Sequence, residues 1–179
     1  MRVLGARVEG SLETDTRSFV TADGRLDFER LLEEFAAFWR EHGDVLAAGF
    51  SYHEVAPQLV LMAYVQRVVN GGGTIEREYG VGRGRIDLLV RWPHVAPGSS
   101  GGKRELQREA IELKVWSEKR PDPLARGLDQ LDAYLGRLGL DHGTLVIFDR
   151  RAEAPPIESR TRLDATRTPA GRAVRLLRA

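Results

Sequence analysis

Two apolar runs in this chain carry charged residues where a strand in a protein core would normally have none. The first run, residues 84 to 90, contains Asp87, and the second, residues 109 to 115, contains Glu112 and Lys114. Because side chains alternate along a strand, Glu112 and Lys114 emerge on one face of the second run. If the two runs pair as an antiparallel hairpin, Asp87 meets them at one point of the sheet.

This arrangement predicts a site for a divalent cation. Two carboxylates a few ångströms apart repel each other, and a cation between them allows both to stay ionised. The alternative is an ordinary exposed strand pair, in which Glu112 and Lys114 form a surface ion pair with Arg85 or Asp87. The apolar residues around these positions favour the first interpretation, because they mark both runs as core strands.

The order of these residues resembles the motif of the PD-(D/E)XK nuclease superfamily, in which a hairpin carries Asp and (D/E)-x-K. Here Asp87 is followed by Glu112-x-Lys114 after 25 residues (112 minus 87). Further along, Gln130 and Tyr134 form the Gln-x-x-x-Tyr element of RecB-like members, on a predicted helix just after the second strand. The three motifs occur in the order and on the elements that the resemblance requires.

The resemblance covers roughly residues 50 to 150. Nucleases of this group also occur as the C-terminal domain of AAA-type ATPases, and residues 82 to 87 look like the form found there. The resemblance implies an α/β, restriction-endonuclease-like fold, with a mixed central sheet flanked by helices. It also implies DNA as a partner and suggests an AAA-type ATPase as another.

Metal-dependent hydrolysis of DNA phosphodiester bonds is the function that this resemblance implies. Asp87, Glu112 and the main-chain carbonyl of Leu113 would hold Mg²⁺ or Mn²⁺. Lys114 would orient or activate the attacking water and offset the charge of the phosphate.

A further metal ligand in this superfamily usually comes from an acid on the preceding helix, and in some RecB-like members from a histidine. Glu54 is the first choice and His53 the second. Glu54 could instead be a helix-capping residue, and Glu76 or Glu78 on the preceding strand are rivals.

Residues outside the metal site are expected to bind the nucleic acid. By resemblance, Gln130 and Tyr134 would form hydrogen bonds near the metal and the DNA. Trp92 and Trp116 could stack on bases, although packing is the favoured interpretation. Basic side chains near the site could form a phosphate-binding patch, the alternative being a scattered solvated surface. They are Arg83, Arg85, Lys103, Arg104, Lys119, Arg120 and Arg126.

Length and composition suit one domain with extensions. The 179 residues are 42% hydrophobic, which is enough for a core, and the net charge is only +1, so a basic patch would have to be local. No cysteine is present, which excludes disulfides and thiolate zinc sites. With no apolar run near the length of a membrane span and no signal peptide, we expect a cytoplasmic protein that binds no membrane.

Hydrophobic periodicity predicts three helices and a mixed set of strands. Residues 1 to 50 are interpreted as a lead-in with an amphipathic packing helix, and residues 51 to 179 as the nuclease-like domain. The predicted helices are residues 27 to 42, 51 to 70 and 121 to 138. The predicted strands are residues 74 to 80, 84 to 92, 108 to 116 and 144 to 148, followed by a polar terminal hairpin of residues 158 to 164 and 172 to 177. Residues 93 to 104 are predicted to form a loop.

Two other classes of function remain open at this point. The first is a catalytically inactive module that keeps the fold and binds DNA or regulates an ATPase. The second is a protein-interaction domain that uses the aromatic stripe of residues 28 to 39, for which packing is the simpler explanation. The sequence does not specify an oligomeric state.

Overall fold

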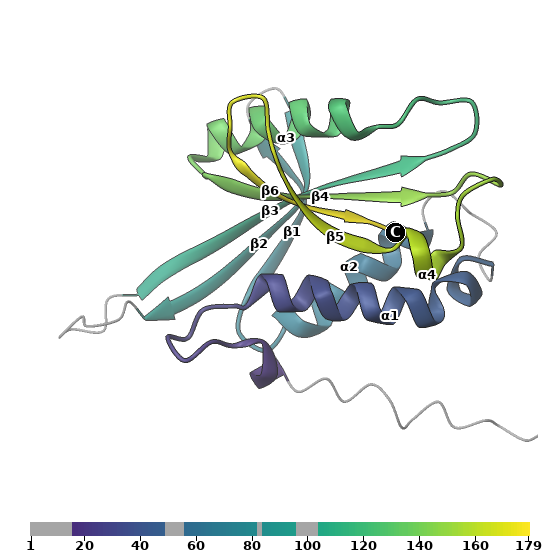
Figure 1. Cartoon of the computed structure of the whole chain (residues 1–179). Helices are drawn as coiled ribbons and strands as arrows, with labels where there is room; N and C mark the ends of the chain where they lie inside the picture. Colours follow the sequence, from purple (N-terminus) through teal and green to yellow (C-terminus); the bar gives the residue numbers. More distant parts are fainter. Residues whose placement is uncertain (1–15, 49–55, 82–83, 96–103) are drawn as a thin grey trace, which may run out of the picture.

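A computed structural model describes residues 16 to 48, 56 to 81, 84 to 95 and 104 to 179. The chain forms a six-stranded mixed sheet with helices on both faces (Figure 1). This architecture confirms the expected α/β class and the mixed central sheet flanked by helices. The elements are η1 (Thr16–Phe19), α1 (Phe28–Ala48), α2 (Ala56–Val69), β1 (Thr74–Val81), β2 (Gly84–Val95), β3 (Arg104–Trp116), α3 (Leu124–Leu138), β4 (His142–Asp149), α4 (Ile157–Arg160), β5 (Arg162–Arg167) and β6 (Ala173–Arg178).

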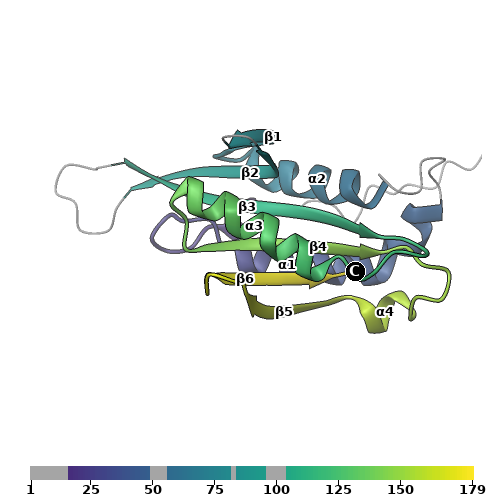
Figure 2. The same ribbon diagram turned by 90° about the horizontal axis from the view of Figure 1, so that it is seen from above.

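The strands lie in the order β1-β2-β3-β4-β6-β5, which Figure 2 shows from above. The first three strands form an antiparallel meander, so the hairpin expected between the two charged runs is confirmed. β3, β4 and β6 are parallel to one another, and β5 returns antiparallel to β6. The predicted terminal hairpin therefore exists and extends the main sheet. Its first strand was predicted to start at residue 158, which is wrong, because residues 157 to 160 form α4 and the strand begins at Arg162.

Helices α1 and α2 cover one face of the sheet and α3 covers the other (Figure 1). The core is accordingly divided into two clusters. The cluster beneath α1 and α2 includes Leu88, Ile111 and Val146, whereas the cluster beneath α3 includes Leu89 and Ala110. The two faces of the hairpin strands are thus both buried, as their apolar sequences predict.

Helix α1 begins after Asp27, whose side chain accepts the N–H of Arg30 at 3.0 Å and so caps the helix. The helix continues to Ala48, beyond the predicted end at residue 42. Gly43 lies inside the helix as a packing position, because a Cβ there would clash with the side chain of Ile157. The aromatic stripe of α1 faces inward, with Phe35 and Trp39 fully buried, so it is part of the core.

The strands β2 and β3 extend further than predicted. Pro93 suggested a strand end, yet it is paired with Leu106, and β2 continues to Val95. The side chains of Trp92 and Gln107 are buried there against the segment that precedes α1. Of the predicted loop, residues 96 to 103 lie outside the described residues.

A buried network of polar side chains connects the segment before α1 to β3. The side chain of Gln107 pairs with both main-chain groups of Leu26, at 2.9 Å each, and donates to Glu109 at 2.9 Å. Glu109 also contacts His142 and Arg175, each at 3.2 Å. Burial alone would raise the pKa of Glu109, but the hydrogen bonds from His142 and Gln107 and the charge of Arg175 outweigh it and hold this pKa below its usual range.

We expect Gln107→Ala to lower the free energy of unfolding by about 1 to 3 kcal/mol, because the buried Leu26 N–H and the Glu109 Oε1 each lose their hydrogen bond with Gln107. Denaturant titration measures this change. Gln66→Ala on α2 is the control, since Gln66 makes only an exposed contact with Asn70 and its loss should change stability by less than about 0.5 kcal/mol. Equal losses of stability in the two variants would contradict a structural role for the buried polar network.

Candidate active site

The paired part of the β2–β3 hairpin ends at Leu88 and Ile111, one residue short of Asp87 and Glu112. At that point the carboxylate of Asp87 accepts the N–H of Leu113 at 2.7 Å. A side chain therefore occupies the place that a main-chain carbonyl would take in a continuing ladder. This bond fixes the Asp87 carboxylate against β3, at the level of Glu112.

Strand β2 is distorted at Asp87. Ile86 packs in the cluster beneath α3 together with Leu89, whereas Leu88 packs in the cluster beneath α1 and α2. In a regular strand Ile86 would share a face with Leu88, and this prediction is wrong here because the alternation breaks between them. On the neighbouring strand, Glu78 has a φ of 47°, which is rare for a residue other than glycine. The irregularity thus spans both strands beside the candidate site.

Glu112 and Lys114 lie side by side on β3, and the Lys114 Nζ donates to the Glu112 Oε1. Only 3% of the Glu112 side chain is exposed, so this is not the surface ion pair that the alternative interpretation required. The other carboxylate oxygen, Oε2, is buried and has no hydrogen-bond partner among the described residues. A buried carboxylate oxygen without a donor is costly and suggests a missing cationic partner.

The pKa of Glu112 reflects this environment. The pKa of Glu112 is raised to about 7, mainly by burial and next by the nearby charge of Asp87, against the opposing hydrogen bond and charge of Lys114. Burial likewise raises the pKa of Asp87, against the opposing effects of the Leu113 N–H and Lys114. Near neutral pH Glu112 is therefore partly protonated, and a bound cation would favour the ionised form of both carboxylates.

Helix α3, which covers one face of the sheet, supplies two further polar groups. The Tyr134 Oη accepts the N–H of Arg85 at 3.3 Å, at the start of β2. The Gln130 Oε1 is buried without a hydrogen-bond partner in the described part of the chain. Two buried acceptor oxygens, one on β3 and one on α3, thus lack donors.

The expected further ligands, Glu54 and His53, lie outside the described residues. Within residues 16 to 48, 56 to 81, 84 to 95 and 104 to 179, no three acidic or histidine side chains form a group that could hold a metal ion. Asp87 and Glu112 supply two carboxylates, so a complete carboxylate set would need a ligand from elsewhere.

The rival ligands on β1 are engaged in ion pairs. Glu76 contacts Arg91 at 2.9 Å, and Glu78 contacts Arg85 at 3.0 Å. Glu78 lies near enough to raise the pKa of Asp87, but its side chain is 73% exposed. Neither acid joins the pair formed by Asp87 and Glu112.

The members of the predicted basic patch are spread over several elements. Arg83 and Lys103 lie outside the described residues, and Arg85 is paired with Glu78. Arg104 begins β3, eight residues before Glu112 (112 minus 104), which corresponds to about 26 Å along a strand. The other described members are exposed residues of the loop after β3 or of α3, namely Lys119, Arg120 and Arg126.

Neither tryptophan offers a free ring face for stacking on a base. Trp92 is 5% exposed, and its indole N–H donates to the carbonyl of Gly24 at 2.9 Å. Trp116 carries the guanidinium of Arg151 over its ring, 3.4 Å from the centroid. The packing interpretation is therefore the better one for both.

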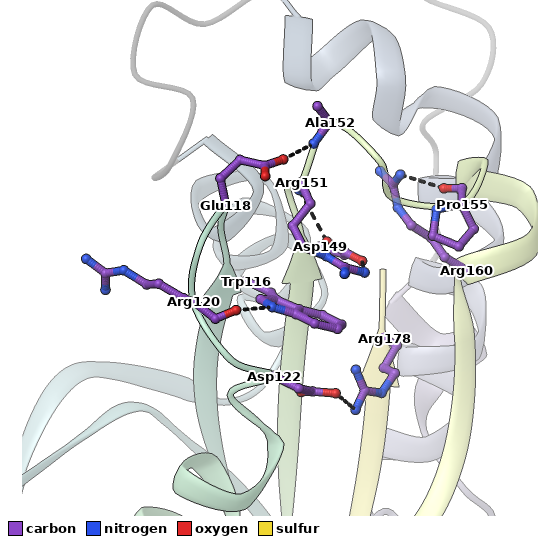
Figure 3. A network of polar contacts seen from close by, with 10 residues as sticks. All are labelled: Trp116, Glu118, Arg120, Asp122, Asp149, Arg151, Ala152, Pro155, Arg160 and Arg178. Carbon is purple, nitrogen blue, oxygen red and sulfur yellow. Dashed lines mark hydrogen bonds and ion pairs between the residues drawn. The ribbon is translucent and has the colours of Figure 1, made fainter.

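The sequence analysis missed a cluster of polar side chains around Trp116, shown in Figure 3. Asp149 and Arg178 lie there, at or near the carboxyl ends of β4 and β6. The available signal was the position of Trp116 two residues after Lys114, on the same face of β3, beside the charged end of the next parallel strand.

Comparison of the chain with protein-family models, with curated proteins and with solved structures finds no match. None of the described helices has the length and apolar character needed to cross a membrane. The site must therefore be interpreted from its own geometry.

The raised pKa of Glu112 predicts a loss of stability as the pH rises. Its ordinary value is 4.5, so between pH 4.5 and about 7 the folded chain keeps a proton that the unfolded chain has lost. The folded state is favoured by this proton at low pH, and the free energy of unfolding should fall by about 2 to 3 kcal/mol across that window.

Denaturant titration at pH 4.5 and pH 8, in EDTA, measures this effect as the difference between the wild type and Glu112→Gln. The amide of the variant does not titrate, so its stability should lack this component of the pH dependence. Identical pH profiles for the two proteins would show that Glu112 titrates normally.

Proposed function

We propose that this protein is a metal-dependent nuclease that hydrolyses DNA phosphodiester bonds. The observation that carries the proposal is the buried Glu112 Oε2, which has no donor among the described residues, in a carboxylate near enough to Asp87 for its charge to raise the Glu112 pKa. A structural ion pair would need only Lys114, and a second carboxylate would weaken it. Two carboxylates with one ammonium group are instead what a cation-dependent phosphodiester reaction requires.

The donor set fits a hard divalent cation. Asp87, Glu112 and the carbonyl of Leu113 would hold Mg²⁺ or Mn²⁺, which prefer oxygen ligands. When bound, the cation supplies positive charge to the phosphate and lowers the pKa of water. Glu54 remains the proposed source of a further carboxylate, with His53 as the second choice.

The chain's own residues position the substrate around this centre. Asp87 is held in place by the Leu113 N–H, so its free oxygen has a fixed direction. The Lys114 ammonium can donate to a phosphate oxygen or to the attacking water, since it has three donors and Glu112 uses one. Tyr134 fixes the start of β2 through the Arg85 N–H, and the amide of Gln130 is available on α3.

A catalytically inactive DNA-binding or regulatory module is the second candidate. It is favoured by the direct contact between Lys114 and Glu112 and by the presence of only two carboxylates at the site among the described residues. An AAA-type ATPase is a proposed partner in either case. A protein-interaction role for the aromatic stripe of α1 has less support, because that stripe is buried.

Cleavage of labelled linear, circular and single-stranded DNA in Mg²⁺ or Mn²⁺ tests the proposal. We expect Asp87→Asn and Lys114→Met to reduce the rate at least about a hundredfold, because each removes charge stabilisation from the reacting phosphate. Asp129→Asn, an exposed position on α3, is the matched control and should cleave at the wild-type rate. If the wild type binds DNA but never cuts it, the inactive module is the correct reading.

Metal binding can be tested apart from cleavage. We expect millimolar Mg²⁺ or Mn²⁺ to raise the unfolding temperature of the wild type, because a ligand bound only to the folded state stabilises it. Glu112→Gln should lose most of this shift, whereas Asp129→Asn should keep it. An equal shift in all three proteins would place any bound metal elsewhere.

A further inference from the structure

A hollow of about 160 Å³ opens at the carboxyl ends of β3, β4 and β6. In open α/β sheets, ligands bind at the carboxyl ends of the parallel strands. Here those ends bring together Trp116, Asp149 and Arg178, with α4 and β5 on the other side (Figure 3). Side chains lining the hollow include Trp116, Asp149, Arg151, Arg160, Arg162 and Arg178.

Four arginines line the hollow together with one acidic side chain, Asp149, and the main chain of Ala179. That carboxylate, Asp149, is held by Arg151 at 2.8 Å through Nε and at 2.6 Å through Nη2. Arg151 also lies flat over Trp116, so it is fixed from two sides. Arg151 therefore has a fixed orientation in the wall of the hollow.

The other three arginines are only partly used. Arg160 donates from Nη1 to the carbonyl of Pro155 at 2.8 Å, while its buried Nε has no partner among the described residues. Arg178 and Arg162 each donate to a carboxylate at 2.8 Å, those of Asp122 and Asp164, which do not line the hollow. Each guanidinium has five donors, so many remain for an anion.

We propose that this hollow binds a phosphate group through Arg160, with Arg162 and Arg178 around it. The planar donors of arginine match the oxygens of a phosphate. The volume is smaller than the roughly 300 Å³ at which pockets for small organic ligands begin, so a phosphate group fits and a whole nucleotide does not.

The hollow lies close to the candidate active site along β3. Glu112, Lys114 and Trp116 alternate on one face of the strand, so Trp116 is about 7 Å beyond Lys114. A DNA strand bound with its scissile phosphate at Glu112 could therefore place a neighbouring or terminal phosphate in the hollow. A DNA phosphate as the ligand rests on the proposed nuclease function. Free inorganic phosphate as the ligand does not depend on that function.

Binding of inorganic phosphate to the full chain, measured by calorimetry at constant ionic strength, tests the site. We expect Arg160→Gln to weaken binding about tenfold or more, because it removes charge-assisted hydrogen bonds. Arg30→Gln, at an exposed ion pair on α1, is the control and should bind as the wild type does. Equal phosphate affinity in the wild type and Arg160→Gln would overturn the proposal.

Arg162→Gln is a second variant, at the exposed rim, where a folding defect is not expected. It should weaken phosphate about threefold while the unfolding temperature stays unchanged. If neither variant changes the affinity, the phosphate binds elsewhere.

Oligonucleotides with and without a 5′ phosphate, compared in EDTA, distinguish the two sources. If the protein binds the phosphorylated strand more tightly, and Arg160→Gln removes this preference, the ligand is a strand terminus. If it binds both strands equally but still binds inorganic phosphate, the ligand is free phosphate. Phosphate binding in a chain that never cuts DNA would refute the nuclease alone, and cleavage without phosphate binding would refute the phosphate site alone.

Discussion

The burial of the Glu112 carboxylate is the constraint on which the rest of this site depends. A carboxylate in a low-dielectric interior must be paired or protonated, and Lys114 satisfies only one of its oxygens. Asp87 increases the cost, because its own carboxylate is held nearby by the Leu113 N–H. The electrostatic cost of these two carboxylates is thus concentrated at one point of the sheet, next to the irregularity in β2. Such penalties concentrate where proteins bind ions or perform chemistry.

The surrounding helices bury the Glu112 carboxylate and so create this electrostatic cost. Helix α3 covers the face on which Glu112 lies and excludes water from it, while α1 and α2 bury the opposite face of the same strands. The parallel run of β3, β4 and β6 then gathers a second polar cluster at its carboxyl end. The Glu112 carboxylate lies within β3, and the guanidinium groups of Arg151 and Arg178 lie by Trp116 at the end of the same strand. The charge along this face therefore changes from negative to positive within a few residues.

Much of the fold could be predicted from the sequence, because its strands are strongly apolar and bounded by clear turns. Once the two apolar runs are taken as a hairpin, alternation along the strands brings Asp87, Glu112 and Lys114 together. The break in alternation at Ile86 could not be predicted, because a regular strand period does not contain it. The place of β6 inside the sheet was also hidden, because Arg175 and Arg178 made that strand look like a surface element. The extension of α1 beyond residue 42 could not be predicted either, as only the packing of Ile157 shows why a glycine lies at position 43 inside the helix.

The two edge strands of the sheet, β1 and β5, have a consequence for self-association. Both expose alternating charges, with Glu76, Arg77 and Glu78 on one edge and Arg162 and Asp164 on the other. Charged residues and irregular backbone on an edge oppose the addition of a strand from another molecule, and the left-handed conformation of Glu78 adds such an irregularity to β1. Growth of the sheet into fibres is therefore disfavoured at both edges, and contacts between copies are directed to the helical faces.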